Sequence, residues 1–340
     1  MFNFLVNLKK LKIYKLILLY FIKPIYDLLW EYLINFKGKL YYFLWHTKKR
    51  EFIDLDKNDK KLISNNQRLK IIASKINDYC SVHLVQRSRK ELLSETFTKS
   101  NPTNAGDKKY NQDLFPRLSN EIQKEIFELA HSELLISTAT KYLKVFPILD
   151  KIIVSHNISN KPEDERGAML WHKDDFGYRS LDLFMAVSDI DEFNGPLKVV
   201  KNKNQLGIFS KSNEENLGNV SEGERGKIKF DHFEKLDNDN VLVLKGEKGT
   251  ALIIDSFTAY HRGGHCLKND RLMLRFSYQT PDSVRVYQKK KFHDEFEKFK
   301  ETFSLDLFLN FLYKEKPSKF LIFFRIYLMK FYRILHVKEN

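Results

Sequence analysis

Two short stretches that lie far apart in the sequence carry side chains whose types and spacing can hold a metal ion. The first contains His172 and Asp174, and the second contains His261. Because alternate residues of a β-strand point to the same face, His172 and Asp174 can present an imidazole and a carboxylate side by side. Two imidazoles and one carboxylate on one face of a metal form the ligand set of non-haem Fe(II) oxygenases. The third ligand must come from elsewhere, and His261 is the candidate because it follows an apolar strand predicted over residues 250–254.

The residues alone leave alternatives to these ligands. His265 lies four positions after His261 and would replace it if the strand lay in another register. Asp175 would have to replace Asp174 from the opposite face of a regular strand, which disfavours it. The pair Gly263-Gly264 after His261 permits another backbone to approach closely.

Other residues near these stretches are assigned structural or surface roles. We expect core positions for Phe184 and Met185, with the wall of a cosubstrate pocket as the alternative. Cys80 and Cys266 are the two cysteines, too few for a disulfide framework or a four-thiolate zinc site, and they suit a reducing compartment. Structural roles are expected for His83, His131 and Cys266, and solvated surface positions for Lys173 and Arg179.

The motifs around these residues follow one another in a recognisable order. The first half reads Trp171 to Asp174 (WHKD), an apolar strand, an acidic turn at residues 189–192, and Asn194 to Leu197 (NGPL). The second half reads Gly249-Thr250, then His261 to Gly263 (HRG), then Arg271 to Tyr278. This pattern resembles the phytanoyl-CoA dioxygenase family of Fe(II)/2-oxoglutarate-dependent oxygenases, over residues 145–282.

The resemblance implies a fold and a set of roles. The fold is a double-stranded β-helix, a jelly roll of the cupin-like kind, in an α+β chain with flanking N- and C-terminal helices. His172, Asp174 and His261 would be the iron ligands and catalytic centre. Arg271 falls on the family's 2-oxoglutarate arginine, and Arg275, four residues on and on the same strand face, is the alternative. Fe(II) would be the cofactor, 2-oxoglutarate and O2 the cosubstrates, and ascorbate a candidate reductant.

The sequence departs from the family pattern at two places. The family's Gly-Ser-His after the NGPL strand is replaced by residues 201–204, KNKN, and the usual Gly-Asp pair is Gly249-Thr250. Both departures concern a loop and a sheet edge, so they affect the expected substrate site more than the expected iron site. An intact Asp174 disfavours halogenation, because related halogenases carry a small residue there, and hydroxylation is therefore expected.

The positive charge is concentrated at the two ends of the chain. The net charge is +14, with ten Lys/Arg against two acidic residues in 1–50 and seven against two in 311–340. A nucleic-acid enzyme is expected to carry its basic stripe on its functional domain, so nucleic acid is not expected as a partner. Cationic, aromatic-rich helices at both ends favour peripheral contact with a membrane surface or, equally, packing on the catalytic core. The uncharged apolar run 16–22 is too short to span a bilayer, which needs ~20 residues.

These observations predict four segments. Residues 1–50 form cationic amphipathic helices, 51–144 the helical N-terminal part of the catalytic domain, 145–282 the β-rich core with the iron site, and 283–340 C-terminal cationic, aromatic-rich helices. The spacing of apolar residues predicts helix within 121–143, and residues 202–230 are expected to form a long loop. Short β-branched and aromatic runs predict strands at 151–156, 181–187, 196–200, 241–244, 250–254 and 271–278.

The expected activity is hydroxylation of a small or lipid-linked organic substrate, with release of succinate and CO2. The expected location is cytoplasmic, with peripheral association on the cytoplasmic membrane face. The alternatives are a membrane-peripheral binding protein with an inactive metal site, and a metal-binding cupin-like isomerase that does not use 2-oxoglutarate.

Overall fold

The computed structural model describes part of the chain. The described residues are 25, 28, 35, 36, 38–40, 42, 43, 51–55, 60–93, 111–159, 169, 171–174, 180–201, 227, 228 and 241–281. The predicted C-terminal helices of 283–340 and most of the predicted N-terminal helices lie outside these residues. The roles considered for Asp175 and Arg179 also lie outside them.

Two antiparallel sheets form the core. The six-stranded sheet has the order β1-β9-β5-β11-β3-β2, and the five-stranded sheet has the order β7-β4-β10-β6-β8. The strands are β1 Lys60–Ile63, β2 Asn111–Asp113, β3 Ile148–Asn157, β4 Trp171–His172, β5 Ser180–Ala186, β6 Lys198–Val200, β7 Lys227–Ile228, β8 Val241–Val243, β9 Ala251–Ile254, β10 His261–Arg262 and β11 Arg271–Gln279.

The connectivity of eight of these strands defines a double-stranded β-helix. From β3 to β6 the chain alternates between the sheets at every step, and it does so again from β8 to β11. The result is β9-β5-β11-β3 in one sheet facing β4-β10-β6-β8 in the other, which is a jelly-roll arrangement. β1 and β2 extend the edges of the first sheet, and β7 extends an edge of the second. The predicted fold class of the core is confirmed.

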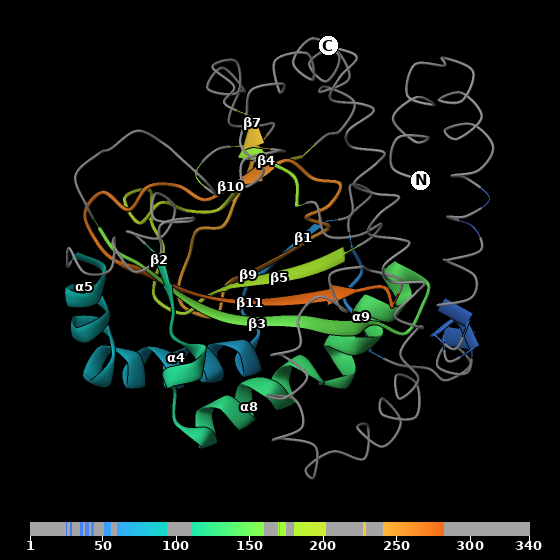
Figure 1. The fold of residues 1–340 in the computed structure, drawn as a ribbon, viewed down its shortest axis with the longest axis horizontal. Coiled ribbons are helices and arrows are strands. Elements are labelled where there is room, and N and C mark those ends of the chain that lie inside the picture. The colour runs from blue at the N-terminus through green and yellow to red at the C-terminus, as the bar shows by residue number, and fades with distance from the viewer. Residues whose placement is uncertain are drawn as a thin grey trace, which may run out of the picture.

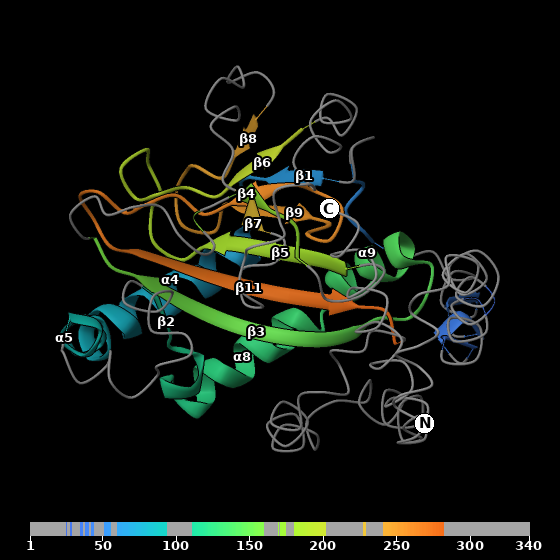
Figure 2. The same ribbon diagram turned by 45° about the horizontal axis from the view of Figure 1, so that its top comes forward.

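Helices cover one face of the six-stranded sheet. α4, α8 and α9 lie against this face (Figure 1), and the five-stranded sheet lies on the opposite side (Figure 2). Side-chain caps start two of the helices, since Asn66 Oδ1 accepts from Leu69 N at 3.1 Å and Ser119 Oγ accepts from Ile122 N at 3.3 Å. The helical elements are α4 Gln67–His83, α5 Val85–Leu93, η2 Phe115–Arg117, α8 Asn120–Ala130 and α9 Glu133–Leu143.

The two-residue period of the strands sorts side chains between two buried clusters. On β11, Leu272, Leu274, Phe276 and Tyr278 belong to the cluster shared with the helices. Met273 instead belongs to the cluster between the sheets, which holds Phe184, Leu197, Val199, Leu244, Leu252, Ile254 and Ala259. Because alternate residues share a face, Arg271, Met273 and Arg275 all lie on the inner face of β11. The fold thus puts both predicted arginines on the side where the two sheets meet.

The structure differs from the sequence predictions in three places. The helical pattern of 121–143 is two helices, because the chain leaves α8 after Ala130 and begins α9 at Glu133. The region 51–144, predicted to be helical, also contributes β1 and β2, which form because open sheet edges offer them backbone partners. The two-residue strand β7 lies inside the expected loop of 202–230, for the same reason. These short strands pair at sheet edges, so their own composition carries little signal.

Candidate metal centre

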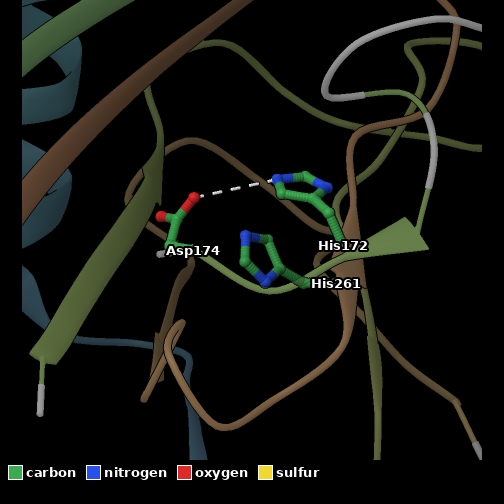
Figure 3. Close-up of side chains that lie close together, drawn as sticks. All are labelled: His172, Asp174 and His261. Atoms are coloured by element: carbon green, nitrogen blue, oxygen red, sulfur yellow. Dashed lines mark ion pairs between the residues drawn. The ribbon is translucent and has the colours of Figure 1, made fainter. Parts of the chain in front are cut away.

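Pairing of β4 with β10 brings the two predicted histidines opposite each other. The strands are antiparallel, with His261 directly across from His172. The two rings lie beside each other, with centroids 4.4 Å apart and planes inclined by 48° (Figure 3). Both residues are buried. Residues that face each other across a ladder have neighbouring Cβ atoms, so the register alone brings the imidazoles together.

Asp174 completes the group from the residues just after β4. Its backbone N donates to Ser256 O at 2.8 Å, which fixes where the side chain starts. Its Oδ1 lies 3.9 Å from His172 Nε2, and the carboxylate faces both rings (Figure 3). One ligand atom from each of His172, Asp174 and His261 lies within 4.8 Å of the other two. We refer to these three residues as the metal triad.

The ring orientation of His261 suits a ligand. Its Nδ1 lies 3.0 Å from Ala259 O, so Nδ1 carries the proton and donates to that carbonyl. This leaves the lone pair on Nε2 for a metal, and metal-binding histidines are commonly held in this way by a carbonyl or a carboxylate.

The turn between β9 and β10 contains Ala259, and hydrogen bonds to both carboxylate oxygens of Asp255 stabilise this turn. Asp255 Oδ1 accepts from the backbone N of Phe257 at 3.0 Å and of Thr258 at 3.1 Å. Asp255 Oδ2 accepts from the hydroxyl of Tyr142, on α9, at 2.6 Å. Burial raises the pKa of Asp255, while these donors act to lower it. The turn of 255–259 therefore holds both the backbone of Asp174, through Ser256 O, and the ring of His261, through Ala259 O.

The electrostatics of the site favour an ionised ligand. Burial opposes the charged form of Asp174, but the positive charge of the adjacent Arg275 outweighs this effect. The pKa of this carboxyl is therefore held well below its usual range. An ionised carboxylate and neutral imidazoles are the forms that bind a metal ion.

The triad fits a divalent first-row metal. Such ions bind nitrogen and oxygen at ~2.0–2.2 Å, so two ligands on one face of the ion lie about 3 Å apart. The triad's ligand atoms lie within 4.8 Å of one another, so binding a metal there would draw them closer together. Two imidazoles with one carboxylate suit iron and its neighbours, whereas calcium and magnesium prefer sites built from oxygen.

The two predicted arginines occupy different surroundings on the inner face of β11. Arg275 Nη2 lies 2.5 Å from Asp174 Oδ2 and 3.1 Å from Asp182 Oδ1. Arg271 lies at the start of the strand and is buried, with 3 % of its surface exposed. Four residues of a strand extend about 13 Å, so the backbone of Arg271 is well removed from that of Arg275.

The remaining candidates lie outside the triad. His265 is not part of the metal-binding cluster found among the described residues. Lys173 projects toward Tyr260, with Nζ 4.3 Å from the ring centroid. Phe184 lies in the cluster between the sheets and Met185 in the cluster beneath the helices. Cys266 is buried, its Sγ donates to Asn194 O at 3.1 Å, and burial raises the pKa of its thiol.

Sequence reasoning missed the polar residues that support the triad. Asp182 is fully buried in β5, and its carboxylate accepts from Ser256 Oγ and from Arg275. One signal was present, because Asp182 interrupts the otherwise apolar run of residues 181–186 in β5, two residues before Phe184 and therefore on the same strand face. Ser256 and Tyr142 carried no comparable signal, since their roles depend on contacts between distant segments.

Comparison with known proteins gave distant structural matches. No protein-family model matches the sequence, and no curated protein does so. Among solved structures, EctD from S. alaskensis with 2-oxoglutarate and 5-hydroxyectoine is 12% identical. The match covers 66% of this chain and 73% of the EctD chain, with a TM-score of 0.40. HygX from Streptomyces hygroscopicus with nickel and 2-oxoglutarate bound is 9% identical, with coverage of 65% and 82% and a TM-score of 0.40. A non-heme monooxygenase, the ThoJ–Ni complex, is 12% identical, with coverage of 66% and 75% and a TM-score of 0.34.

The strand order is that of a double-stranded β-helix, and the metal triad has the composition and spacing of a metal site. Both features agree with what the sequence resemblance implies. The chain is a jelly-roll protein in which two histidines and one aspartate converge at one buried point.

Proposed function

We propose that this protein is an Fe(II)- and 2-oxoglutarate-dependent dioxygenase that hydroxylates a small or lipid-linked organic substrate. The observation that carries the proposal is the metal triad, with His261 Nδ1 tied to a carbonyl so that Nε2 can bind a metal. Iron held there would supply the O2-dependent oxidation, with 2-oxoglutarate converted to succinate and CO2.

The chain's own residues hold and orient the reactants. His172, Asp174 and His261 would hold the metal through one atom each, which leaves coordination positions for small molecules. Arg271 would bind the distal carboxylate of 2-oxoglutarate, because a guanidinium offers two parallel donors to a carboxylate. Its position on the inner face of β11 directs it toward the space between the sheets, where Met273 and the apolar cluster around it limit the access of water.

The test is iron-dependent succinate formation. Purified protein is incubated with Fe(II), 2-oxoglutarate and O2, with and without candidate substrates, and succinate and CO2 are measured. We expect turnover that requires iron and is lost in His172→Ala and Asp174→Ala. Tight metal binding without 2-oxoglutarate binding would favour a cupin-like isomerase. Binding of both without succinate release in any substrate screen would favour a binding protein with an inactive site.

The N-terminal helical residues support a proposal about location. Among the described residues of this part, Ile25, Leu28, Phe36, Leu40 and Phe43 are each more than half exposed. All five are in helical conformation. The buried residues are small or polar instead: Asn35 is 3 % exposed, and Gly38 O accepts from Phe146 N at 3.1 Å.

These exposed apolar side chains and the +8 charge of residues 1–50 fit an anionic membrane surface. No helix among the described residues is long and apolar enough to cross a bilayer. From the exposed apolar side chains and the positive charge we infer peripheral contact with the cytoplasmic face of a membrane, which would give the site access to lipid-linked substrates. Leu28→Glu with Leu40→Glu should reduce co-sedimentation with anionic vesicles, whereas Val82→Glu, at an exposed apolar position of α4, should not. Equal sedimentation of both variants would contradict the proposal.

A further inference from the structure

Arg275 is placed to act on the metal triad through Asp174. The arginine is on the inner face of β11, and its guanidinium lies over the ring of Phe184, 4.9 Å from the centroid. Its Nη2 donates to Asp174 Oδ2 at 2.5 Å. Its Nε donates to Asp182 Oδ1 at 3.2 Å, so one planar group joins two buried carboxylates.

Asp182 is itself fixed by the turn that supports the triad. It is 0% exposed, and its Oδ2 accepts a short hydrogen bond from Ser256 Oγ. Ser256 Oγ also lies 3.1 Å from Ser180 Oγ, and Ser256 O accepts from Asp174 N at 2.8 Å. The same serine therefore locates the backbone of Asp174 and the carboxylate that holds Arg275.

This arrangement leaves one oxygen of Asp174 for a metal. Oδ2 is engaged by Arg275, whereas Oδ1 is the oxygen on the side of His172, 3.9 Å from Nε2. The terminal torsion of an aspartate is broad, so without a partner the carboxylate could turn and offer both oxygens. A charge-assisted hydrogen bond to a rigid guanidinium opposes that rotation.

Asp182 also balances the charge beside the triad. Alone, Arg275 would place a positive charge next to a divalent cation and weaken its binding. The neighbouring carboxylate of Asp182 offsets that charge, so Asp174 keeps its full negative charge for the metal. A buried charge that lost its partner would instead be strongly unfavourable, which explains why the two residues occur together.

We propose that Arg275 and Asp182 are a positioning pair that holds Asp174 as a single-oxygen metal ligand. The proposal rests on the metal site of the proposed function and assigns Arg275 to the ligand, with Arg271 remaining for the cosubstrate. Neither residue of the pair needs to contact 2-oxoglutarate or substrate for this role.

The experiment measures metal affinity without cosubstrate. Co(II) is titrated into wild-type protein, Arg275→Gln and Asp182→Asn, and binding is followed by calorimetry and by the visible absorption of bound Co(II). Loss of partners that orient a ligand typically costs ~10–100-fold in metal affinity, and we expect a loss of this size in both variants. The absorption of Arg275→Gln should also change in intensity, because a released carboxylate can bind through both oxygens and alter the coordination number.

Two controls separate positioning from a general effect on folding. Asp150→Asn alters another buried carboxylate, which accepts from Gln279 Nε2 at 3.1 Å, and should leave Co(II) affinity unchanged. Arg275→Lys keeps the positive charge but cannot bind both carboxylates at once. Its Co(II) affinity should therefore lie between those of Arg275→Gln and the wild type. If a single variant fails to fold, the double variant Arg275→Gln with Asp182→Asn removes both charges together, and it should fold and show the same loss.

The outcomes distinguish this inference from the proposed function. If wild-type protein does not bind Co(II), the metal site and the proposed function fail. If wild-type and Arg275→Gln bind Co(II) equally and with the same absorption, the positioning role fails alone. If Arg275→Gln keeps Co(II) affinity but weakens 2-oxoglutarate binding to the Co(II)-loaded protein, Arg275 is a cosubstrate anchor instead.

Discussion

Replacement of Gly195 by alanine tests whether a close backbone crossing holds the site together. Gly195 has φ of 63°, in the left-handed region. A Cβ there would lie 2.3 Å from Gly264 O and 2.5 Å from Gly264 C. The two glycines are also joined by a hydrogen bond from Gly264 N to Gly195 O at 3.1 Å. Gly264 lies between His261 and Arg271 in the chain, so a displacement would reach both a metal ligand and the proposed cosubstrate arginine.

The expected cost has two parts. A left-handed conformation costs a non-glycine residue roughly 1–2 kcal/mol. Forcing an extra carbon against a packed neighbour adds roughly 1–3 kcal/mol, and here the neighbour is backbone, which cannot rotate away. Gly195→Ala should therefore lose about 2–5 kcal/mol of unfolding free energy, a large part of the 5–15 kcal/mol typical of a folded protein.

Urea unfolding, followed by circular dichroism, measures this loss, and Gly246→Ala is a comparison variant without a backbone clash. Gly246 also has positive φ, 138°, which costs a non-glycine residue at least as much as the left-handed region does, but its added Cβ would meet a side-chain atom, Thr250 Oγ1, at 2.8 Å. A side chain can move, so this variant should show the conformational cost alone. The close backbone crossing does not hold the site together if Gly195→Ala loses less than about 2 kcal/mol.

Arg271→Lys keeps the positive charge but loses the two parallel donors of the guanidinium. Calorimetry should therefore show weaker 2-oxoglutarate binding to the metal-loaded variant, with unchanged metal affinity. If the variant binds 2-oxoglutarate as tightly as the wild type, Arg271 does not have this role. Tyr142→Phe deletes the hydroxyl that lies 2.6 Å from Asp255 Oδ2. Urea unfolding should show a loss of ~1–3 kcal/mol in unfolding free energy, and Co(II) titration should show weaker binding. Unchanged Co(II) affinity would mean that the turn of 255–259 does not depend on α9. Burial lowers the pKa of His131 from 6.5 to about 4, so the unfolded chain binds the proton first on acidification. The unfolding free energy therefore loses nothing through His131 above pH 6.5, and it falls by up to roughly 3 kcal/mol as the pH drops toward 4. His131→Gln should flatten that part of the pH profile of unfolding, and parallel profiles would contradict the assignment.

Much of the β core could be predicted because its signals are local. The strands β3, β5, β9 and β11 all lie within a few residues of the apolar, β-branched runs in the sequence. Local patterns were weaker where pairing decides the structure. β1, β2 and β7 are short edge strands, and the pattern of 121–143 could not show that the chain breaks between α8 and α9.

The predicted metal ligands come together, but most of the contacts that support them could not be predicted. The pairing of His261 with His172 depends on the register of two strands of two residues each, which their own sequences cannot specify. The contacts of Arg275 with Asp174 and Asp182 join residues that are 101 and 93 positions apart. Hydrogen bonds over such separations follow from the packed fold and leave no periodic trace in the chain.

The sequence by itself determined which side chains can hold a metal, which strands direct alternate side chains to opposite faces of a sheet, and where the positive charge lies. These properties depend on residue type and on spacing within one element. The tertiary structure decided that Asp174 presents Oδ1 beside His172 while Arg275 binds Oδ2, and that Ser256 supports both aspartates. Such choices depend on which distant segments the two sheets bring into contact, because a hydrogen bond exists only where packing has set both partners within reach.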